Sequence, residues 1–343
     1  MNPFVTSSIN RWLLAWYENH ARILPWRLGH PDPYKTWISE IMLQQTQVVA
    51  VVPYFERFLK AFPTVEKLAG APLEKILTLW SGLGYYSRAR NLHAAAQIIA
   101  EKGTFPSARL EWIELPGIGK YTAGAIASIV FDEKVPVVDG NVIRVLTRLF
   151  ALKGDPKKNP LKDKLWKLAA GLLPDRRVGD FNQALMELGA LVCTPENPKC
   201  GVCPLRRNCL ALSLNKVADF PTPLPKPKTI RVLIRAALIE KNGKYLIAKR
   251  NSDRHFQEMW EFPQGDPSQL GLSADKKESF AKIRHSIMKR RIQLQPVLYH
   301  YIGGVPKVSK EYVAFRWIFK EELKNFPTSS LNNKIVKRLR HVP

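Results

Sequence analysis

Cysteine is nearly absent from this chain of 343 residues, and its few occurrences are confined to one stretch. Four cysteines lie within seventeen residues, with the spacing C-x6-C-x2-C-x5-C, at Cys193, Cys200, Cys203 and Cys209. Disulfides are disfavoured, because a chain of this length can bury its own core and its first residues lack the charged-then-apolar pattern of a secretory signal. Thiolates so close in sequence can instead converge on one inorganic centre.

Two kinds of inorganic centre suit four thiolates. A structural zinc site usually has two short C-x2-C pairs, or histidines among its ligands, whereas only Cys200 and Cys203 form a short pair here. We therefore favour a cubane [4Fe–4S] cluster, with zinc and unrelated thiols as the alternatives.

Long apolar runs and acidic residues are also scarce. No run reaches the roughly 18–20 residues that a membrane-spanning helix needs. Asp and Glu number 29 against 53 Lys and Arg, which gives a formal charge of +24 and predicts a polyanionic partner. The excess is greatest in residues 226–343, where 25 Lys and Arg face 10 Asp and Glu. We expect a soluble, cytoplasmic protein with reduced thiols, associated with the nucleoid if it is bacterial.

The length predicts about two domains, and the residue pattern changes once along the chain. Residues 1–214 carry apolar residues at helical spacing between short loops, which predicts an all-α domain. Residues 215–229 contain four prolines and predict a semi-rigid linker. Residues 230–343 predict an α+β domain, with strands at 232–239, 245–248 and 312–319, a hairpin turn at Asn242-Gly243, and helices at 279–290 and 331–339.

Two motifs in the helical part carry chemistry. The stretch Leu115–Gly124 places Gly117 and Gly119 in a tight turn that opens a helix, and backbone amides at such a turn suit a phosphate group. About twenty residues later, Asp139 follows a short apolar run and precedes Gly140-Asn141. A Gly-Ile-Gly turn is weak support by itself, since many turns have this composition.

The hairpin, the downstream aspartate and the four-cysteine loop, in this order, resemble the helix-hairpin-helix DNA glycosylases of the endonuclease III superfamily. In the bifunctional branch of that superfamily, a catalytic lysine stands two residues after the second hairpin glycine. This chain has Tyr121 there, and a phenol cannot form a Schiff base, so lyase activity should be absent or slight. Ile143, where some relatives have a lysine, weakens lyase activity further. Tyr121 and the Asp139-Gly140-Asn141 sequence are similar to the MutY branch, the adenine DNA glycosylases.

Four further stretches carry this resemblance. They are Leu24–Arg27, Ser39–Gln47, Gly82–Asn91 and Phe181–Met186, and the likeness is dense over about residues 10–215. The resemblance implies a helix-hairpin-helix core with a [4Fe–4S] cluster in loop 193–209. It also implies base excision repair of duplex DNA, by hydrolysis of the glycosidic bond of adenine mispaired with 8-oxoguanine or guanine. We expect a monomer that has no association with membranes.

The resemblance assigns roles to four catalytic residues. A helical glutamate between apolar neighbours is more often a buried side chain satisfied by local hydrogen bonds, but here Glu40 is expected to be the general acid that protonates N7 of adenine. Asp139 would stabilise or capture the oxocarbenium ion of the sugar. Tyr121 and Asn141 would orient these groups.

Binding roles follow in the same way. The adenine pocket is expected to be lined by Arg22, Leu24, Trp26, Arg27 and Gln183, although a pure core role is as plausible for Leu24 and Trp26. Gln45 and Tyr85 match the residues that fill the base stack once the adenine has left it. Arg88 would pack or contact phosphate, and the hairpin would hold the backbone through Gly117, Gly119 and Lys120.

The last third resembles a Nudix-like domain, through Gly243, the strand at 245–248, Arg250 and the run Trp260–Gly265. Hydrolytic Nudix enzymes need paired glutamates on the following helix to hold magnesium, and this chain offers Glu278 among lysines. We therefore expect a recognition domain. The Phe-Ser-His tip that reads 8-oxoguanine in the family is not identifiable in residues 299–310, where His300 and Ser309 are the nearest candidates.

Two other functions compete with adenine excision. A mismatch thymine glycosylase also lacks the lysine but usually lacks the second domain. A noncatalytic DNA-damage binder would need neither Glu40 nor Asp139.

Overall fold

The computed structural model describes residues 3–225, 228–251, 258–287 and 289–339. The chain forms two compact units, which we call the helical unit (Met1–Ala69 with Ala94–Pro225) and the C-terminal unit (Gly70–His93 with Lys226–Pro343). The division drawn from the sequence did not anticipate that Gly70–His93 would group with the C-terminal residues. Within the described residues, no helix is both long and apolar enough to cross a membrane.

The helical unit confirms the predicted all-α character of the N-terminal part. Its longer helices are α1 (Pro3–His20), α2 (Pro33–Leu43), α3 (Val48–Ala61), α6 (Ser87–Lys102, shared with the other unit), α8 (Lys120–Phe131), α9 (Gly140–Leu149), α10 (Leu161–Gly171) and α11 (Val178–Leu191). Short helices lie between them, namely α4 (Val65–Ala69), α7 (Arg109–Ile113) and α12 (Leu210–Ser213).

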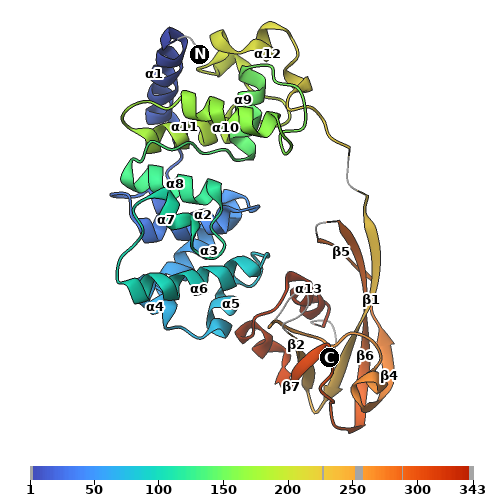
Figure 1. Cartoon of the computed structure of the whole chain (residues 1–343). Helices are drawn as coiled ribbons and strands as arrows, with labels where there is room; N and C mark the ends of the chain where they lie inside the picture. Colours follow the sequence, from blue (N-terminus) through green and yellow to red (C-terminus); the bar gives the residue numbers. More distant parts are fainter. Residues whose placement is uncertain (1–2, 226–227, 252–257, 288, 340–343) are drawn as a thin grey trace. The chain divides into compact units, whose positions relative to one another are not determined.

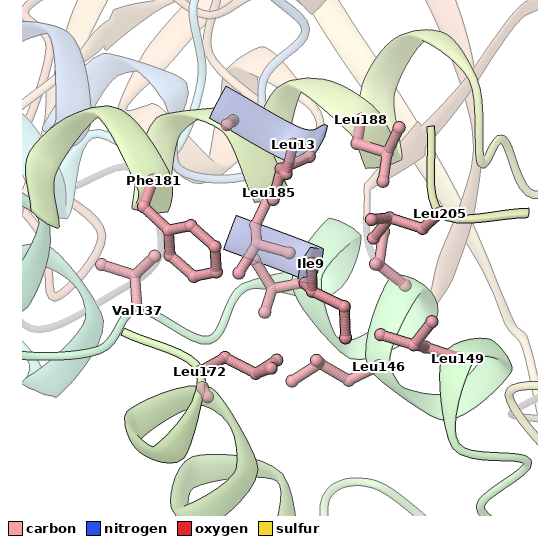
Figure 2. Close-up of a cluster of buried hydrophobic side chains, with 14 of the residues drawn as sticks. Ile9, Leu13, Val137, Leu146, Leu149, Leu172, Phe181, Leu185, Leu188 and Leu205 are labelled. Carbon is pink, nitrogen blue, oxygen red and sulfur yellow. The ribbon is translucent and has the colours of Figure 1, made fainter. Parts of the chain in front are cut away.

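One hydrophobic core joins the helices around α9 (Figure 2). Val142, Val145, Leu146 and Leu149 recur at helical spacing and are all buried, so α9 turns one apolar face inward. Leu205 from the cysteine loop enters the same core. The core therefore fixes the cysteine loop and the start of α9 to one rigid body. Its other contributors are Ile9 and Leu13 of α1, Val137, Leu172, and Phe181, Leu185 and Leu188 of α11.

The start of helix α2 is fixed by its N-terminal cap, and its orientation is fixed by aromatic packing. Asp32 caps the helix by accepting a hydrogen bond from the Lys35 amide at 2.9 Å, and Pro33 occupies the first helical position. Trp37 is fully buried and its ring lies 6.1 Å from that of Trp112. This packing fixes the helix face on which Glu40 lies.

The C-terminal unit contains a mixed sheet with strand order β3-β2-β1-β6-β4, to which β7 adds on β2 and β5 on β6. Helix α13 (Ser330–Leu339) packs on one side through Leu331, Ile335 and Leu339 (Figure 1). The strands are β1 (Ile230–Lys241), β2 (Lys244–Arg250), β3 (Trp260–Glu261), β4 (Leu272–Ser279), β5 (Ile283–Ile287), β6 (Arg290–Gly304) and β7 (Tyr312–Phe319).

Most predicted elements of this unit are confirmed. The β1–β2 hairpin turns at Asn242-Gly243, whose φ values are 52° and 77°. Two-residue hairpin turns with positive φ at both central residues match the twist of the flanking strands. The expected helix at 279–290 is wrong, because β5 and the start of β6 occupy these residues. Ile283 and Ile287 are four residues apart, a spacing that puts two side chains on one face of a helix or of a strand. Glu278 therefore lies on β4, not beside a Nudix-type helix.

The segment Gly70–His93 contains helix α5 (Leu73–Trp80) and the turn that leads into α6. Three hydrogen bonds join it to the C-terminal residues of its unit. The Tyr86 hydroxyl donates to the Thr328 carbonyl at 3.0 Å, and the Thr328 amide donates to the Ser81 hydroxyl at 3.1 Å. The Trp260 indole donates to the Glu74 carboxylate at 3.0 Å. These bonds fix both ends of the turn that carries Tyr85.

Candidate active site

A cavity of about 830 Å³ opens in the helical unit. Helices α2, α8, α9 and α11 line it, together with the loop before α2. Its volume is within the usual range for a small-molecule site. The lining includes every predicted catalytic and adenine-pocket residue, namely Arg22, Leu24, Trp26, Arg27, Glu40, Tyr121, Asp139, Asn141 and Gln183.

Glu40 is a buried acid of the cavity, with 6% of its surface exposed. Burial raises the pKa of its carboxyl to about 7, because water no longer solvates the charged form. The Tyr121 hydroxyl opposes this shift by donating a hydrogen bond to Oε2 at 2.9 Å, whereas the negative charge of Asp139 adds to it. Glu40 therefore holds a proton near neutral pH and can release it.

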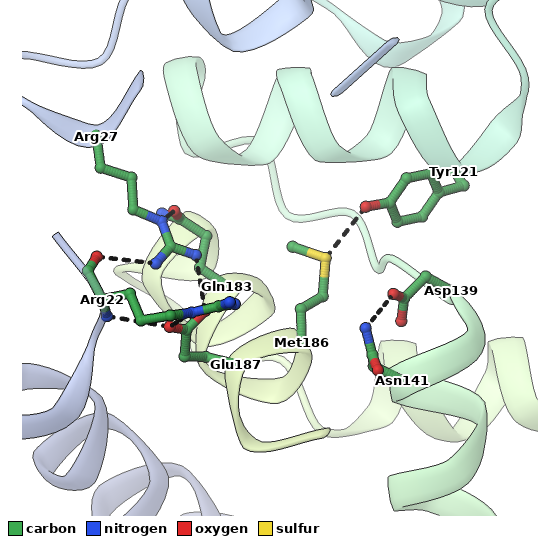
Figure 3. A network of polar contacts seen from close by, with 8 residues as sticks. All are labelled: Arg22, Arg27, Tyr121, Asp139, Asn141, Gln183, Met186 and Glu187. Carbon is green, nitrogen blue, oxygen red and sulfur yellow. Dashed lines mark hydrogen bonds and ion pairs between the residues drawn. The ribbon is translucent and has the colours of Figure 1, made fainter. Parts of the chain in front are cut away.

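Tyr121 stands in the first turn of α8. Its hydroxyl donates to Glu40 and also lies 3.2 Å from the Met186 sulfur. Figure 3 shows the contact with Met186. Burial and the nearby carboxylates raise the pKa of this phenol well above its usual value. Tyr121 thus stays protonated and serves as a hydrogen-bond donor to Glu40.

Asp139 caps the N-terminus of α9 and faces the cavity. Its Oδ1 accepts from the Val142 amide at 2.7 Å, and its Oδ2 accepts from the Asn141 side chain at 2.9 Å (Figure 3). Burial raises the pKa of this carboxyl, while the two hydrogen bonds and Arg144 lower it. The cap holds the carboxylate in one orientation beside the substrate space.

A buried ion cluster lies at the other side of the cavity. Glu187 is 1% exposed and binds Arg22 at 2.6 Å and Arg27 at 3.2 Å, while Arg27 also donates to Gln183 at 3.0 Å (Figure 3). Sequence reasoning named the two arginines and Gln183 but missed Glu187. Its position four residues after Gln183, on the same face of α11, was the available signal.

Two arginines of α9 join the catalytic end of this helix to the cysteine loop, and sequence reasoning missed both. Arg144 donates to the Asn141 side chain at 2.8 Å and to the Cys193 carbonyl at 2.7 Å. Arg148 is 3% exposed and donates to the Thr194 carbonyl at 2.7 Å, with its guanidinium 3.4 Å from the Cys193 sulfur. Arg144 therefore links the cysteine loop to Asn141, and the fold of this loop influences the positions of Asp139 and Asn141.

The four cysteines that the sequence offers as cluster ligands lie in the loop between α11 and α12. All are partly buried free thiols, and three of them pack against the core of Figure 2. Burial raises the pKa of the Cys203 thiol to about 12, and repulsion from the other three thiolates contributes to that rise. Among the described residues, no three His, Cys, Asp or Glu side chains converge on a point suited to one metal ion.

The predicted DNA-contact residues lie outside the cavity lining. Gly117 adopts a φ of 77° and Gly119 caps α8, as expected for a hairpin turn. The Lys120 ammonium lies 4.0 Å from the centre of the Trp166 ring. Gln45 and Tyr85 are exposed residues with φ values of 60° and 50°, a conformation that non-glycine residues rarely adopt. Such backbone strain is concentrated at functional sites.

Arg88 is the least exposed of the predicted DNA contacts, at 8%. Its guanidinium stacks near the rings of Trp80 and Tyr85, at 5.4 Å and 5.3 Å, and donates to the Gly84 carbonyl at 3.2 Å. These contacts hold the Arg88 side chain in a packed position.

Two protein families match different parts of this chain. Residues 38–170 match the HhH-GPD superfamily of base excision DNA repair proteins, and residues 235–338 match the NUDIX domain family. An adenine DNA glycosylase of Buchnera aphidicola subsp. Baizongia pistaciae is 43% identical over 256 residues, which cover 74% of this chain and 72% of the relative. The chain belongs to the adenine DNA glycosylase family.

Some other family members are longer than this chain. The Arabidopsis thaliana adenine DNA glycosylase is 40% identical over 298 residues, which cover 75% of this chain but 47% of the relative. Among solved structures, a thermostable thymine-DNA glycosylase aligns with a TM-score of 0.55 and 30% identity, over 62% of this chain and 98% of that protein. That structure supports the glycosylase fold of the helical unit.

Proposed function

We propose that this chain is a monofunctional adenine DNA glycosylase that hydrolyses the glycosidic bond of adenine mispaired with 8-oxoguanine or guanine. One observation carries the proposal: a buried Glu40 with a pKa of about 7 shares a cavity with Asp139 and is hydrogen-bonded to Tyr121. The partner is duplex DNA. The protein acts as a cytoplasmic monomer, nucleoid-associated in a bacterium.

In this proposal, Glu40 donates its proton to N7 of the extruded adenine. Protonation makes the base a better leaving group, and the glycosidic bond then breaks with positive charge developing on the sugar. Asp139, held by its α9 cap and by Asn141, faces that charge and stabilises it or forms a transient bond with the sugar. Arg22, Arg27 and Gln183 bind the edges of the adenine.

The monofunctional assignment rests on the residues available as nucleophiles. Among the described residues that line the cavity there is no lysine. Tyr121 holds the position that lyase relatives give to an amine, and its raised pKa keeps it a phenol. The opened sugar should therefore remain uncut until alkali is added.

We also propose that the cysteine loop holds a [4Fe–4S] cluster through Cys193, Cys200, Cys203 and Cys209. When bound, the cluster supplies four iron–sulfur bonds that cross-link the loop. Arg144 and Arg148 then hold this loop against α9, and the glycosidic cleavage needs no electron transfer. The basic residues around the loop can contact DNA phosphates.

For the DNA contacts, we propose that the hairpin binds the backbone through Gly117, Gly119 and Lys120, and that Gln45 and Tyr85 enter the base stack. The C-terminal unit recognises the lesion strand. His300 lies in β6 and pairs with Glu240 at 3.2 Å, and the Ser309 hydroxyl accepts backbone hydrogen bonds from Glu311 and Tyr312. Both side chains are thus engaged within the protein and are not held ready to contact the lesion. This supports the proposal that the protein discriminates less sharply between 8-oxoguanine and guanine.

The test is an oligonucleotide assay with A·8-oxoguanine, A·G and T·G duplexes, each incubated with the protein and then treated with alkali. We expect strand breaks at adenine in the first two duplexes only, and only after alkali. Breaks at thymine would identify a mismatch thymine glycosylase. Binding without breaks in any duplex would identify a noncatalytic damage binder.

A further inference from the structure

The first half of the long strand β1 forms an open sheet face together with β5 and β6. β1 runs parallel to β6 from the pair Ile230↔Arg290 onward, and β5 runs antiparallel to β6. Successive side chains of a strand point to opposite faces of the sheet. Ile283, Ile292 and Leu294 enter the core beneath α13. Their sequence neighbours must point to the opposite face of the sheet.

That opposite face is rich in arginine. The strand register places Arg231 opposite Arg291, Leu233 opposite Gln293, and Arg235 opposite Gln295. On the other side of β6, Arg284 lies opposite Gln293 and Ser286 lies opposite Arg291. We call these eight residues the arginine face: Arg231, Leu233, Arg235, Arg284, Ser286, Arg291, Gln293 and Gln295.

The arginine face has no acidic member and few neutralising neighbours. Arg235 reaches Asp266 at 4.0 Å, with both side chains about half exposed. In the described part of the chain, Arg231, Arg284 and Arg291 form no ion pair within 4.0 Å, and all three are exposed. Like charges directly opposite each other on adjacent strands, about 4.8 Å apart, destabilise a sheet. The Arg231↔Arg291 pair is therefore a cost to folding that an anionic ligand would relieve.

We propose that the arginine face binds the sugar–phosphate backbone of duplex DNA, outside the lesion cavity. This inference rests on the proposed function and assigns it a second contact surface. Guanidinium groups bind phosphate through paired N–H donors, which a sheet presents at regular intervals. The face contains no aromatic residue, unlike the centres of protein–protein interfaces. Contacts of this kind are independent of base sequence.

The same sheet offers a matched control surface. Lys324, Lys337 and Arg338 are exposed basic residues in and near α13, on the opposite side of the sheet. Replacing these three by glutamine changes the net charge by the same amount as replacing Arg231, Arg284 and Arg291 by glutamine. The two triple variants differ in where the charge is lost.

The experiment measures the dissociation constants of the wild type and both variants for an undamaged duplex of about 30 base pairs, between 50 and 300 mM KCl. For R231Q/R284Q/R291Q, we expect the slope of log K against log salt to decrease by about 2–3, because each lost phosphate contact removes about 0.9. The affinity at 100 mM salt should fall about 10- to 100-fold. The control variant should keep the wild-type slope. Thermal melting checks that all three proteins are folded.

An unchanged slope for R231Q/R284Q/R291Q would overturn the proposal, and so would an equal decrease in both variants, which would show a diffuse effect of net charge. If the triple variant does not fold, the single variants Arg231→Gln, Arg284→Gln and Arg291→Gln should each lower the slope by about 1. A wild type that releases no adenine would refute the proposed function and leave the comparison of slopes intact.

Discussion

At the scale of single residues, burial raises the pKa of two cavity carboxyls, and hydrogen bonds from Val142 and Asn141 oppose that rise at Asp139. Burial keeps Glu40 protonated near neutral pH, and the Tyr121 hydroxyl moderates the shift. Asp139 is oriented by backbone and side-chain donors at the start of α9. An acid and a carboxylate with separate tasks can thus occupy one cavity, which is the arrangement that glycosidic cleavage needs.

The pH dependence of excision follows from the pKa of Glu40. A general acid works only when protonated, so the rate should be highest below pH 7 and fall about tenfold per pH unit above it. The measurement is single-turnover adenine release at subsaturating enzyme between pH 5.5 and 9, which reports the free enzyme. A rate that stays level up to pH 9 would contradict the assignment.

The same pKa predicts a stability effect. Unfolding returns the pKa of Glu40 from about 7 to near 4.5, so between these values the folded protein binds more protons than the unfolded chain. Stability is therefore lost as pH rises through this window. Glu40→Gln should raise the free energy of unfolding by up to about 3 kcal/mol at pH 8 and change it little at pH 5. Denaturant titration at both pH values checks this, and equal effects at the two would count against the raised pKa.

Residues with local signals were predictable from sequence, and residues with distant partners were not. Glu40 lies in a distinctive string, and Asp139 precedes a helix at which it acts as the cap. Glu187, in contrast, meets Arg22 across 165 positions, and Arg148 meets the cysteine loop 45 positions away. Helical spacing places Glu187 on the face of α11 that carries Gln183, but only folding brings these charges to their distant partners.

At the scale of elements, the turn before α6 depends on residues from the end of the chain. Tyr86→Phe removes the donor to the Thr328 carbonyl, and a lost buried hydrogen bond costs about 1–3 kcal/mol. We expect amide hydrogen exchange in residues 82–88 to rise roughly 10- to 100-fold, because this turn opens locally. Hydrogen exchange with peptide resolution measures it.

Tyr34→Phe is the matched control for this prediction. The Tyr34 hydroxyl is also buried and donates to a backbone carbonyl, that of Phe62, at 2.8 Å in the helical unit. It should lower global stability by a similar amount and leave exchange in residues 82–88 unchanged. The same exchange pattern in both variants would show that Tyr86 does not fasten this turn.

The cysteine loop makes a prediction about metal content. Protein purified anaerobically should contain about four irons per chain and absorb broadly near 400 nm. Cys200→Ser should reduce the iron content and the folded fraction more than it changes the rate of the chemical step. One zinc per chain and no iron would refute the cluster.

The hairpin at Asn242-Gly243 was predicted correctly, whereas the helix predicted at 279–290 was wrong. The two cases show when a local sequence pattern is enough to predict secondary structure. The turn has a sequence requirement for positive φ, which Asn-Gly meets directly. The two isoleucines of β5 fit a helix and a strand equally, and the choice is made by pairing with β6, whose residues 290–294 lie opposite. Sheet pairing is a long-range effect that a short window of sequence does not contain.

At the scale of the whole molecule, the excess of basic residues predicts a polyanionic partner such as DNA. The structure shows where part of that positive charge lies on the surface. The net charge of +24 includes the arginine face of the C-terminal unit. Deleting residues 226–343 would remove the arginine face but also the partners of Gly70–His93. Point substitutions therefore separate DNA affinity from the integrity of the fold.

The central claim is that Glu40 supplies the proton that releases adenine. The most direct measurement is single-turnover release of adenine from an A·8-oxoguanine duplex by the wild type and by Glu40→Gln, at pH 6.5 with enzyme in excess, alongside the dissociation constant of each protein for the same duplex. We predict that the variant loses at least about 10²–10⁴-fold in rate and still binds the duplex. A variant that releases adenine at close to the wild-type rate would contradict the account.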